Sequence, residues 1–225
     1  MRRENDFYET APWQVDALVD FLPELSGTIW CPCVGDGSLV RHLQERRPDL
    51  GPFITADIDP TKTANFYGDA TKAEHWARMI AEVGRPDWVI DNFPFDIEID
   101  IVKHAYEAAV CGVVAMARLS FVEATKPFKP RKDGKRRKDA DRERPRGPWL
   151  STHPRTKQIA LERYSFTGDG RSDSASTEWL VWAKVPIAGP FGITAYGYKD
   201  GSAQGFRGRA VPSHVTVTTE EREAG

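Results

Sequence analysis

The sequence predicts an α/β fold, in which a mostly parallel sheet is covered by helices on both faces. Strand-like apolar runs alternate with helical periodicity as far as residue 117, with helices expected at residues 72–83 and 97–109. A glycine turn joins the first strand to the helix after it, as at the start of a βαβ unit. Two late strand-like runs, at residues 158–166 and 177–185, are joined by a polar segment and predict an antiparallel pair.

Composition is that of a single folded domain with extensions. The chain has 225 residues, of which 40% are hydrophobic, and this is enough for one sizeable core. We expect a domain over residues 1–186, with an insert at 126–156, and a glycine-rich tail over residues 187–225. Three cysteines are too few and too odd a number for a disulfide framework, which favours a reducing, cytoplasmic environment. No membrane-spanning run or signal peptide is visible, so no membrane partner is expected.

The first helix and the first strand open the alternating pattern. Residues 15–22 carry an apolar stripe at helical spacing, and Thr10 or Ala11 is the predicted cap of this helix. Residues 27–31 form a short run that is typical of a strand. The turn Gly35-Asp36-Gly37 follows, and glycines at such a place allow a ligand to approach the backbone. A tight turn without a ligand is the alternative.

The second strand, residues 53–59, ends in carboxylates. In nucleotide-binding α/β folds an acidic residue about twenty residues after the glycine turn accepts hydrogen bonds from ribose hydroxyls. Asp57 is the predicted residue, with Asp59 as the alternative. The gap from there to the next acidic turn, at Asp69, is short. The usual crossover helix is therefore expected to be missing or reduced to a loop.

Residues 87–95 predict a buried strand followed by a turn, because Pro94 blocks continuation of the strand. Beyond the strand, Asn92 and the Phe93 carbonyl can accept the two hydrogens of an exocyclic amine. The ring of Phe95 can stack on the flat group that carries this amine. Buried acceptors of this kind reject ligands that cannot satisfy them. The alternative is a strand that ends in an ordinary proline turn.

Residues 126–146 differ sharply in composition from the rest of the chain. They hold eleven Lys or Arg against four Asp or Glu, with several prolines and almost no aliphatic residues. Such a segment cannot build its own core, so we expect a mobile loop whose charge suits a phosphate backbone. A solvated loop without a partner is the alternative. Trp149 and His153, just beyond, could contact bases or pack against the base of the loop. The predicted nucleic-acid contacts are Lys129, Arg131, Lys132, Lys135, Arg136, Arg137 and Lys138.

Taken together, these motifs resemble the class I S-adenosylmethionine-dependent methyltransferases, and more narrowly the phage-type DNA N6-adenine methyltransferases. The resemblance covers about residues 7–120 and 157–185, and it implies a Rossmann-like sheet with an antiparallel C-terminal strand pair. The motifs that carry it are Phe-Tyr-x-Thr-x-Pro at 7–12, Cys-Pro-Cys-Val-Gly-Asp-Gly at 31–37, Gly-Asp at 68–69, Asn-Phe-Pro-Phe at 92–95 and Trp-Leu-Val-Trp at 179–182.

The resemblance implies that the cofactor is S-adenosylmethionine. Tyr8 and Thr10 match a segment that touches its methionine end, and the glycine turn lies beneath the same moiety. Asp57 matches the position that binds the ribose hydroxyls, and Asp69 the position that meets the adenine. The implied cofactor residues are Tyr8, Thr10, Cys31, Gly35, Asp36, Gly37, Asp57 and Asp69.

The resemblance also implies a substrate and a reaction. Residues 92–95 fall on the tetrapeptide that receives the target base, and an enzyme of this kind must flip the base out of the duplex. The implied reaction is methyl transfer to adenine N6, with DNA favoured as the partner. Alternatives are an enzyme acting on RNA or on protein glutamine, and a catalytically weak or inactive protein that keeps the fold and binds nucleic acid.

Two positions depart from the family's pattern. Cys31 stands where the family usually has an acidic residue that pairs with the cofactor's ammonium group. Phe93 replaces the first of two prolines, so the fixed φ of proline is lost there. No metal site is expected, because the three cysteines lack paired Cys-x-x-Cys spacing. Cys33 lies in the first glycine turn, which argues against a cytosine-carbon nucleophile, and the glycine fingerprint is too short for a nicotinamide oxidoreductase. The oligomeric state stays open.

Overall fold

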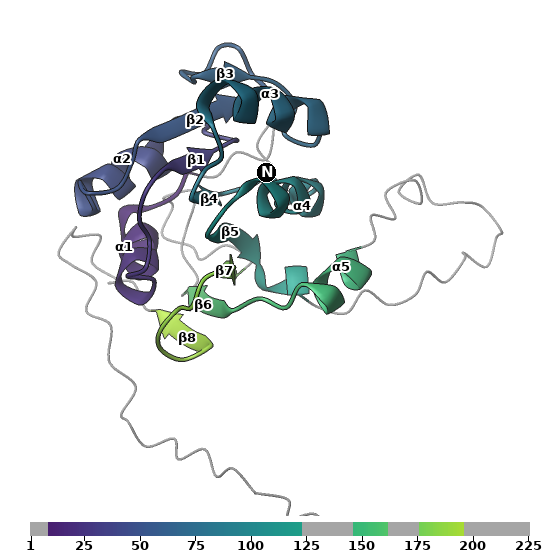
Figure 1. Ribbon diagram of the computed structural model, residues 1–225. Helices are drawn as coiled ribbons and strands as arrows, with labels where there is room; N and C mark the ends of the chain where they lie inside the picture. Colours follow the sequence, from purple (N-terminus) through teal and green to yellow (C-terminus); the bar gives the residue numbers. More distant parts are fainter. Residues whose placement is uncertain (1–8, 123–145, 162–175, 196–225) are drawn as a thin grey trace, which may run out of the picture.

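In the computed structural model, which describes residues 9–122, 146–161 and 176–195, eight strands form one sheet in the order β3-β2-β1-β4-β5-β7-β6-β8 (Figure 1). Neighbouring strands from β3 to β5 are parallel, and β7 lies antiparallel between β5 and β6. The strands are β1 (Ile29–Cys31), β2 (Phe53–Asp57), β3 (Phe66–Tyr67), β4 (Trp88–Asp91), β5 (Gly112–Arg118), β6 (Lys157–Leu161), β7 (Thr177–Ala183) and β8 (Gly192–Ala195).

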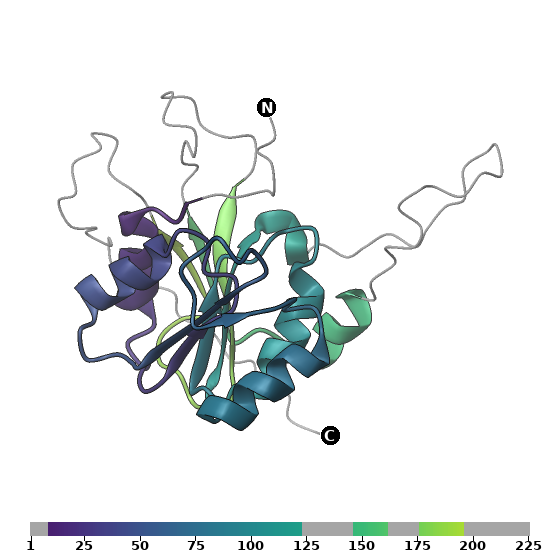
Figure 2. The same cartoon turned by 90° about the horizontal axis from the view of Figure 1, so that it is seen from above.

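Helices cover both faces of this sheet, as Figure 2 shows from above. On one face lie α1 (Pro12–Phe21) and α2 (Ser38–Arg46). On the other face lie α3 (Ala73–Val83), α4 (Glu98–Ala108) and α5 (Arg146–Thr152), and the short 3-10 helix η2 (Leu119–Val122) follows β5. The alternation of side chains along each strand gives one apolar core to each face.

The core on the α1/α2 face includes Leu18, Leu43 and Trp179, and the core on the other face includes Trp76 and Trp182. Tryptophans are among the largest buried side chains on both faces, and such rings contribute much apolar area for each residue ordered. The indole N–H of Trp179 donates to the Gln14 carbonyl at 2.7 Å, which joins β7 to the first helix.

The sheet reverses its order between β1 and β4. From β1 the chain first moves outward through β2 and β3, and it then returns to the other side of β1 to form β4. Loops that follow neighbouring strands therefore diverge at this point, which leaves a crevice at the carboxyl ends of the strands. Ligands of open α/β sheets bind in this crevice.

The predicted fold class is confirmed. No helix lies between β2 and β3, as the short gap in the sequence predicted, and β6 and β7 form the predicted antiparallel pair. Within the described ranges, no helix has both the length and the apolar character needed to span a bilayer.

Two segments contain elements that were not predicted from the sequence. The end of the insert forms α5, where the rings of Trp149 and His153 stack at 4.5 Å and both meet Tyr106 of α4 edge-on. Two roles were predicted for Trp149 and His153, and the structure shows that both pack against Tyr106. In the tail, β8 pairs with β6. This pairing covers backbone groups that β6 would otherwise expose at the edge of the sheet. The predicted contacts between Lys129 and Lys138 lie outside the described residues.

The packing around Gly112 gives a test of the sheet. A Cβ atom there would lie 2.6 Å from the Trp182 carbonyl oxygen and 2.7 Å from the ring of Trp88, and both neighbours are buried. Gly112→Ala should therefore lower the free energy of unfolding in urea by about 1–3 kcal/mol. Gly192→Ala is the control, because its Cβ would meet nothing within 4 Å, and its effect should stay within about 0.5 kcal/mol. Equal stability of the two variants would contradict this packing.

Candidate functional site

A cavity of about 610 Å³ lies in the crevice at the carboxyl ends of the strands. Its wall is built by the segments that follow β1, β2, β3 and β4, together with Thr10 before α1. The wall is acidic. Its charged side chains in the described part of the chain are Asp36, Asp57, Asp59, Asp69, Asp91 and Lys62.

The glycine turn forms one side of this cavity. Gly35 and Gly37 have φ values of +59° and +77°, in the left-handed region that favours glycine. Gly37 caps α2, and the Asp36 carboxylate accepts the Ser38 N–H at 3.0 Å in the first turn of that helix. The Gly35 N–H donates to the Asp57 carboxylate at 2.9 Å. This bond brings the acid at the end of β2 against the turn after β1.

Beyond Asp57 the wall combines acidic and apolar groups. Ile58 is 69% exposed and borders the cavity, so it offers an apolar surface directly beside the Asp57 carboxylate. On the other side of β2, Asp69 accepts hydrogen bonds from the Thr71 N–H at 2.8 Å and from its hydroxyl at 2.7 Å. Acceptors at the edges of an apolar surface suit a ligand with a flat ring and hydroxyl groups.

The predicted amine-binding turn begins where β4 ends. The Asn92 side-chain amide donates to the Thr10 hydroxyl at 3.3 Å, and Thr10 is only 2% exposed. This bond turns the NH2 group of Asn92 toward Thr10 and so sets the direction of the whole amide. Phe93 is 1% exposed and packs in the core beneath α4, while Pro94 borders the cavity.

Phe95 is half-buried and does not border the cavity. The guanidinium of Arg118, at the end of β5, lies over its ring at 4.4 Å from the centroid. This is a cation–π contact, which holds the ring at the carboxyl edge of the sheet. Arg118 takes one face of Phe95, so a group that stacks on this ring must use the opposite face or displace the guanidinium.

Asp91 lies between the two turns and is 2% exposed. Its carboxylate accepts the Cys33 N–H at 2.6 Å and the Asn92 N–H at 2.8 Å. Burial raises the pKa of Asp91 to about 7, although the two N–H groups oppose this shift. Burial, followed by the charge of Asp91, raises the pKa values of the thiols of Cys31 and Cys33 well above their usual range, so both are neutral.

The structure brings together seven of the residues predicted from the sequence. Thr10, Gly35, Asp36, Asp57, Asp69, Asn92 and Pro94 all border the cavity. The other described ones, Cys31, Gly37, Phe93 and Phe95, do not border it. Cys31 is the clearest difference, because side chains alternate along β1 and this one faces the α1/α2 core. Tyr8 lies outside the described residues.

The wall residues that sequence reasoning did not assign to the site include Cys33, Ile58, Lys62 and Asp91. Ile58 carried a usable signal, because an apolar residue directly after the acid of the second strand faces the same crevice. Asp91 carried the signal of a charged residue within a strand that otherwise looks fully buried. In the described part of the chain, no group of three or more His, Cys, Asp or Glu side chains is arranged to hold a metal ion.

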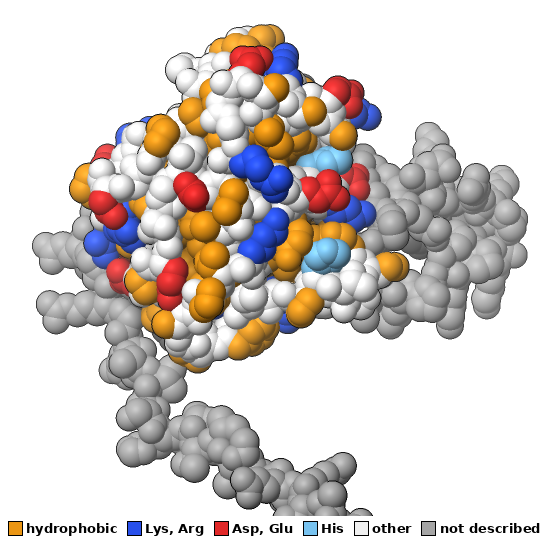
Figure 3. Space-filling model, viewed as in Figure 1, with side chains coloured by type: hydrophobic (Ala, Val, Ile, Leu, Met, Phe, Trp, Pro, Cys, Tyr) orange, Lys and Arg blue, Asp and Glu red, His pale blue; other side chains and the backbone are white. Residues whose placement is uncertain are grey.

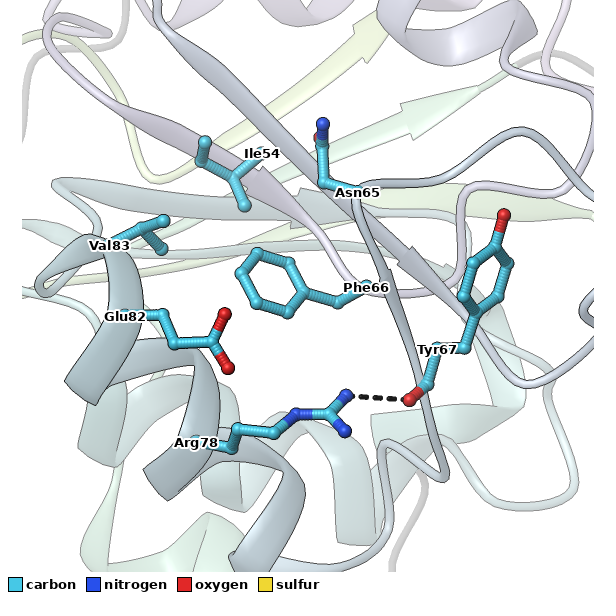
Figure 4. A pocket seen from close by; sticks show the side chains of 7 residues that line it. All are labelled: Ile54, Asn65, Phe66, Tyr67, Arg78, Glu82 and Val83. Carbon is cyan, nitrogen blue, oxygen red and sulfur yellow. Dashed lines mark hydrogen bonds between the residues drawn. The ribbon is translucent and has the colours of Figure 1, made fainter.

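A second cavity, of about 490 Å³, lies at the β3 edge of the sheet (Figure 4). The ring of Phe66 extends between the strand and α3, and Arg78 donates to the Tyr67 carbonyl at 2.6 Å. Glu82 and Val83 place this cavity against the last turn of α3, whereas the acidic cavity meets the segment before its first turn. None of the residues predicted from the sequence borders this second cavity.

The buried ring of Phe93 should stabilise the turn, in place of the proline that is missing. Phe93→Ala should lower the free energy of unfolding in urea by about 3–5 kcal/mol, because loss of a buried ring leaves a cavity. Phe95→Ala is the matched control in the same turn, and it should cost less than half as much because its ring is only half-buried. Similar losses for the two variants would show that Phe93 does not anchor the turn.

No protein-family model and no curated protein matches this sequence. The methyltransferase subunit of a type I restriction-modification system from Streptococcus thermophilus matches the structure with a TM-score of 0.53 at 13% identity, over 78% of this chain and 44% of that chain. An O-methyltransferase from Bacillus cereus matches with a TM-score of 0.50 at 13% identity, over 81% and 84% of the two chains. TomG, an O-methyltransferase from Streptomyces achromogenes, also matches with a TM-score of 0.50, at 12% identity over 79% and 82%.

This chain therefore spans less than half of the restriction-system subunit and most of each O-methyltransferase. At such identities the likeness concerns the fold. The strand order, the reversal between β1 and β4, and the acidic cavity at that reversal agree with it. The chain has the fold of the class I S-adenosylmethionine-dependent methyltransferases.

Proposed function

We propose that this protein transfers a methyl group from S-adenosylmethionine to an exocyclic amine of a nucleic-acid base, namely N6 of adenine in DNA. The observation that carries the proposal is that the acidic residues suited to the cofactor and the Asn92 turn border the same cavity. Thr10 and Asn92 are hydrogen-bonded to each other on that shared wall. A methyl donor and an amine acceptor need such a shared space, because the reacting atoms must be brought into line.

The residues of the cavity fit the cofactor. Its volume falls within the range of about 300–1,000 Å³ that is usual for ligand sites. All three residues line the cavity: Asp57 would offer carboxylate oxygens to ribose hydroxyls, Ile58 would offer an apolar surface to the adenine ring, and Asp69 would accept from a polar edge of that ring. The acidic wall also suits a ligand that carries two positive charges, on its ammonium and its sulfonium.

When bound, S-adenosylmethionine supplies a methyl group that its sulfonium already makes electrophilic. The protein's own residues then act mainly by orientation. Thr10 holds the NH2 group of Asn92, so that the Asn92 carbonyl oxygen is the atom assigned to the substrate amine. That oxygen and the Phe93 carbonyl would accept the two amine hydrogens. This draws electron density toward the nitrogen and stabilises the positive charge that develops on it.

An amine is a better acceptor for this site than a hydroxyl. Two acceptors in the turn call for a group with two hydrogens to donate, and a hydroxyl group has one. A buried acceptor left without a donor would cost about 1–3 kcal/mol, which selects for amines. Phe95 adds an aromatic ring at the same edge, which favours a flat base over an aliphatic substrate.

Charge distribution supports nucleic acid as the partner. On the face shown in Figure 3, acidic, basic and apolar side chains of the described residues are interspersed. The concentrated positive charge of the chain lies instead between residues 126 and 146. In the sequence this segment comes after η2, which follows the strand that ends at Arg118. Arg118 in turn contacts Phe95, so the described strand that precedes the segment ends beside the turn assigned to the base.

Transfer of labelled methyl groups from S-adenosylmethionine to unmethylated DNA tests the proposal. We expect label in N6-methyladenine after digestion to nucleosides. Asn92→Ala should abolish this label, because the amine loses its side-chain acceptor while the cofactor wall stays in place. Phe95→Ala should reduce the rate, whereas Phe95→Tyr, which keeps the ring, should retain most of it.

Calorimetric binding of S-adenosylmethionine to Asn92→Ala is the control for an intact cavity. Label in RNA or in protein, and none in DNA, would replace DNA by that substrate. Cofactor binding without transfer to DNA, RNA or protein would reject an enzymatic function. It would leave a protein that keeps the fold and binds nucleic acid.

The basic segment gives a second prediction. Replacing the seven cations of residues 129–138 by glutamine should weaken DNA binding and reduce its salt dependence, by about 0.9 in the log–log slope for each phosphate that is no longer neutralised. Cofactor binding should not change. Arg41→Gln is the control for removal of positive charge elsewhere, because Arg41 is an exposed cation on α2. An unchanged salt slope in the seven-fold variant would remove this segment from the DNA interface.

A further inference from the structure

Asp91 is a buried acid on the cavity wall to which the proposed reaction gives no role. Its carboxylate holds the Cys33 N–H and the Asn92 N–H, one on each oxygen. An ionised carboxylate has about four acceptor positions, so these two bonds leave capacity for further donors. The side chain is 2% exposed and borders the cavity. A ligand in the cavity is the natural source of such donors.

The groups around Asp91 do not neutralise its charge. From the β1 side it meets the thiols of Cys31 and Cys33, which are both neutral. From the β2 side, the negative charge of Asp57 disfavours ionisation of Asp91. Lys62 is the one Lys or Arg in the described wall, and its ammonium acts on Asp59. A buried carboxylate without a cation beside it is costly unless a ligand brings one.

We infer that Asp91 binds the α-ammonium group of the cofactor and supplies from β4 the negative charge that Cys31 does not supply from β1. The inference rests on the proposed function, since it assumes that cofactor. The parallel register pairs Trp30 with Val89, which sets Cys31 level with Ile90 and Asp91 one residue beyond, at the same edge of the sheet. An ammonium has three N–H donors for a carboxylate, whereas a sulfonium has none, so the hydrogen bond selects the ammonium.

The assignment has a consequence for protons. Without ligand, Asp91 has a pKa of about 7, so part of the protein carries a proton there at neutral pH. A bound ammonium favours the ionised carboxylate and lowers this pKa. Binding should therefore release a fraction of a proton near pH 7. Affinity should rise as the pH is raised from about 6 to about 7, below the pKa of about 7.7–8.0 at which an α-amino group itself loses its proton.

Calorimetry with three ligands tests the assignment. S-adenosylhomocysteine keeps the ammonium and lacks the sulfonium charge, and 5′-methylthioadenosine lacks the amino-acid part altogether. Asp91→Asn should weaken S-adenosylhomocysteine binding about tenfold to a hundredfold, as expected for loss of a charge-assisted hydrogen bond. It should leave 5′-methylthioadenosine binding unchanged, and this ligand also reports that the cavity of the variant is intact.

Wild-type titrations in two buffers of different ionisation enthalpy measure the proton release without any substitution, and this readout does not depend on whether a variant folds.

The outcomes separate the inference from the function. Equal effects of Asp91→Asn on the binding of S-adenosylhomocysteine and of 5′-methylthioadenosine would overturn the role of Asp91 alone. So would a wild-type protein whose binding shows neither proton release nor pH dependence. Weaker binding of S-adenosylmethionine with unchanged S-adenosylhomocysteine would assign Asp91 to the sulfonium and overturn the ammonium assignment. A wild-type protein that binds none of the three ligands would overturn the proposed function itself.

Discussion

The site depends on one buried carboxylate that accepts two backbone N–H groups from different turns. The β1–β4 ladder ends at the pair Trp30 and Val89, so backbone pairing no longer ties the two strands beyond that point. Asp91 continues the connection, because it accepts from Cys33 in the turn after β1 and from Asn92 in the turn after β4. These two bonds fix the distance between the turn after β1 and the turn after β4.

The fold could be predicted from the sequence because its signals are local. Strand and helix periodicities are visible within short windows, and the missing helix before β3 follows from the length of the gap. Asp57, Asp69 and Asn92 all border the cavity, because each lies at or just after the end of a strand at the same edge of the sheet. Cys31, by contrast, does not border the cavity. A three-residue strand is too short for its pattern to show which face each side chain takes, and this one faces α1 and α2.

Features that depend on distant partners could not be predicted. In the sequence, Asp91 is one residue in an apolar run, and the partner that explains its burial is Cys33, fifty-eight residues earlier. The anchoring of Phe93 also depends on residues that are distant in the sequence. A proline would restrict this position through its own φ, whereas Phe93 restricts it by burying its ring in the core beneath α4. The constraint from proline can be read from the residue type, whereas the constraint from Phe93 exists only once the core has formed.

The near-neutral net charge of the chain conceals two opposite fields that the proposed reaction needs. Among the described residues, the wall of the cavity holds five aspartates and one lysine, while the sequence of residues 126–146 is strongly basic. An acidic cavity attracts a cationic cofactor and repels a phosphodiester, so the backbone of a nucleic acid is kept outside it. In the proposed function the basic segment would hold that backbone. A neutral base is then the part of the nucleic acid that can enter, which is the selection that methylation of a flipped base requires.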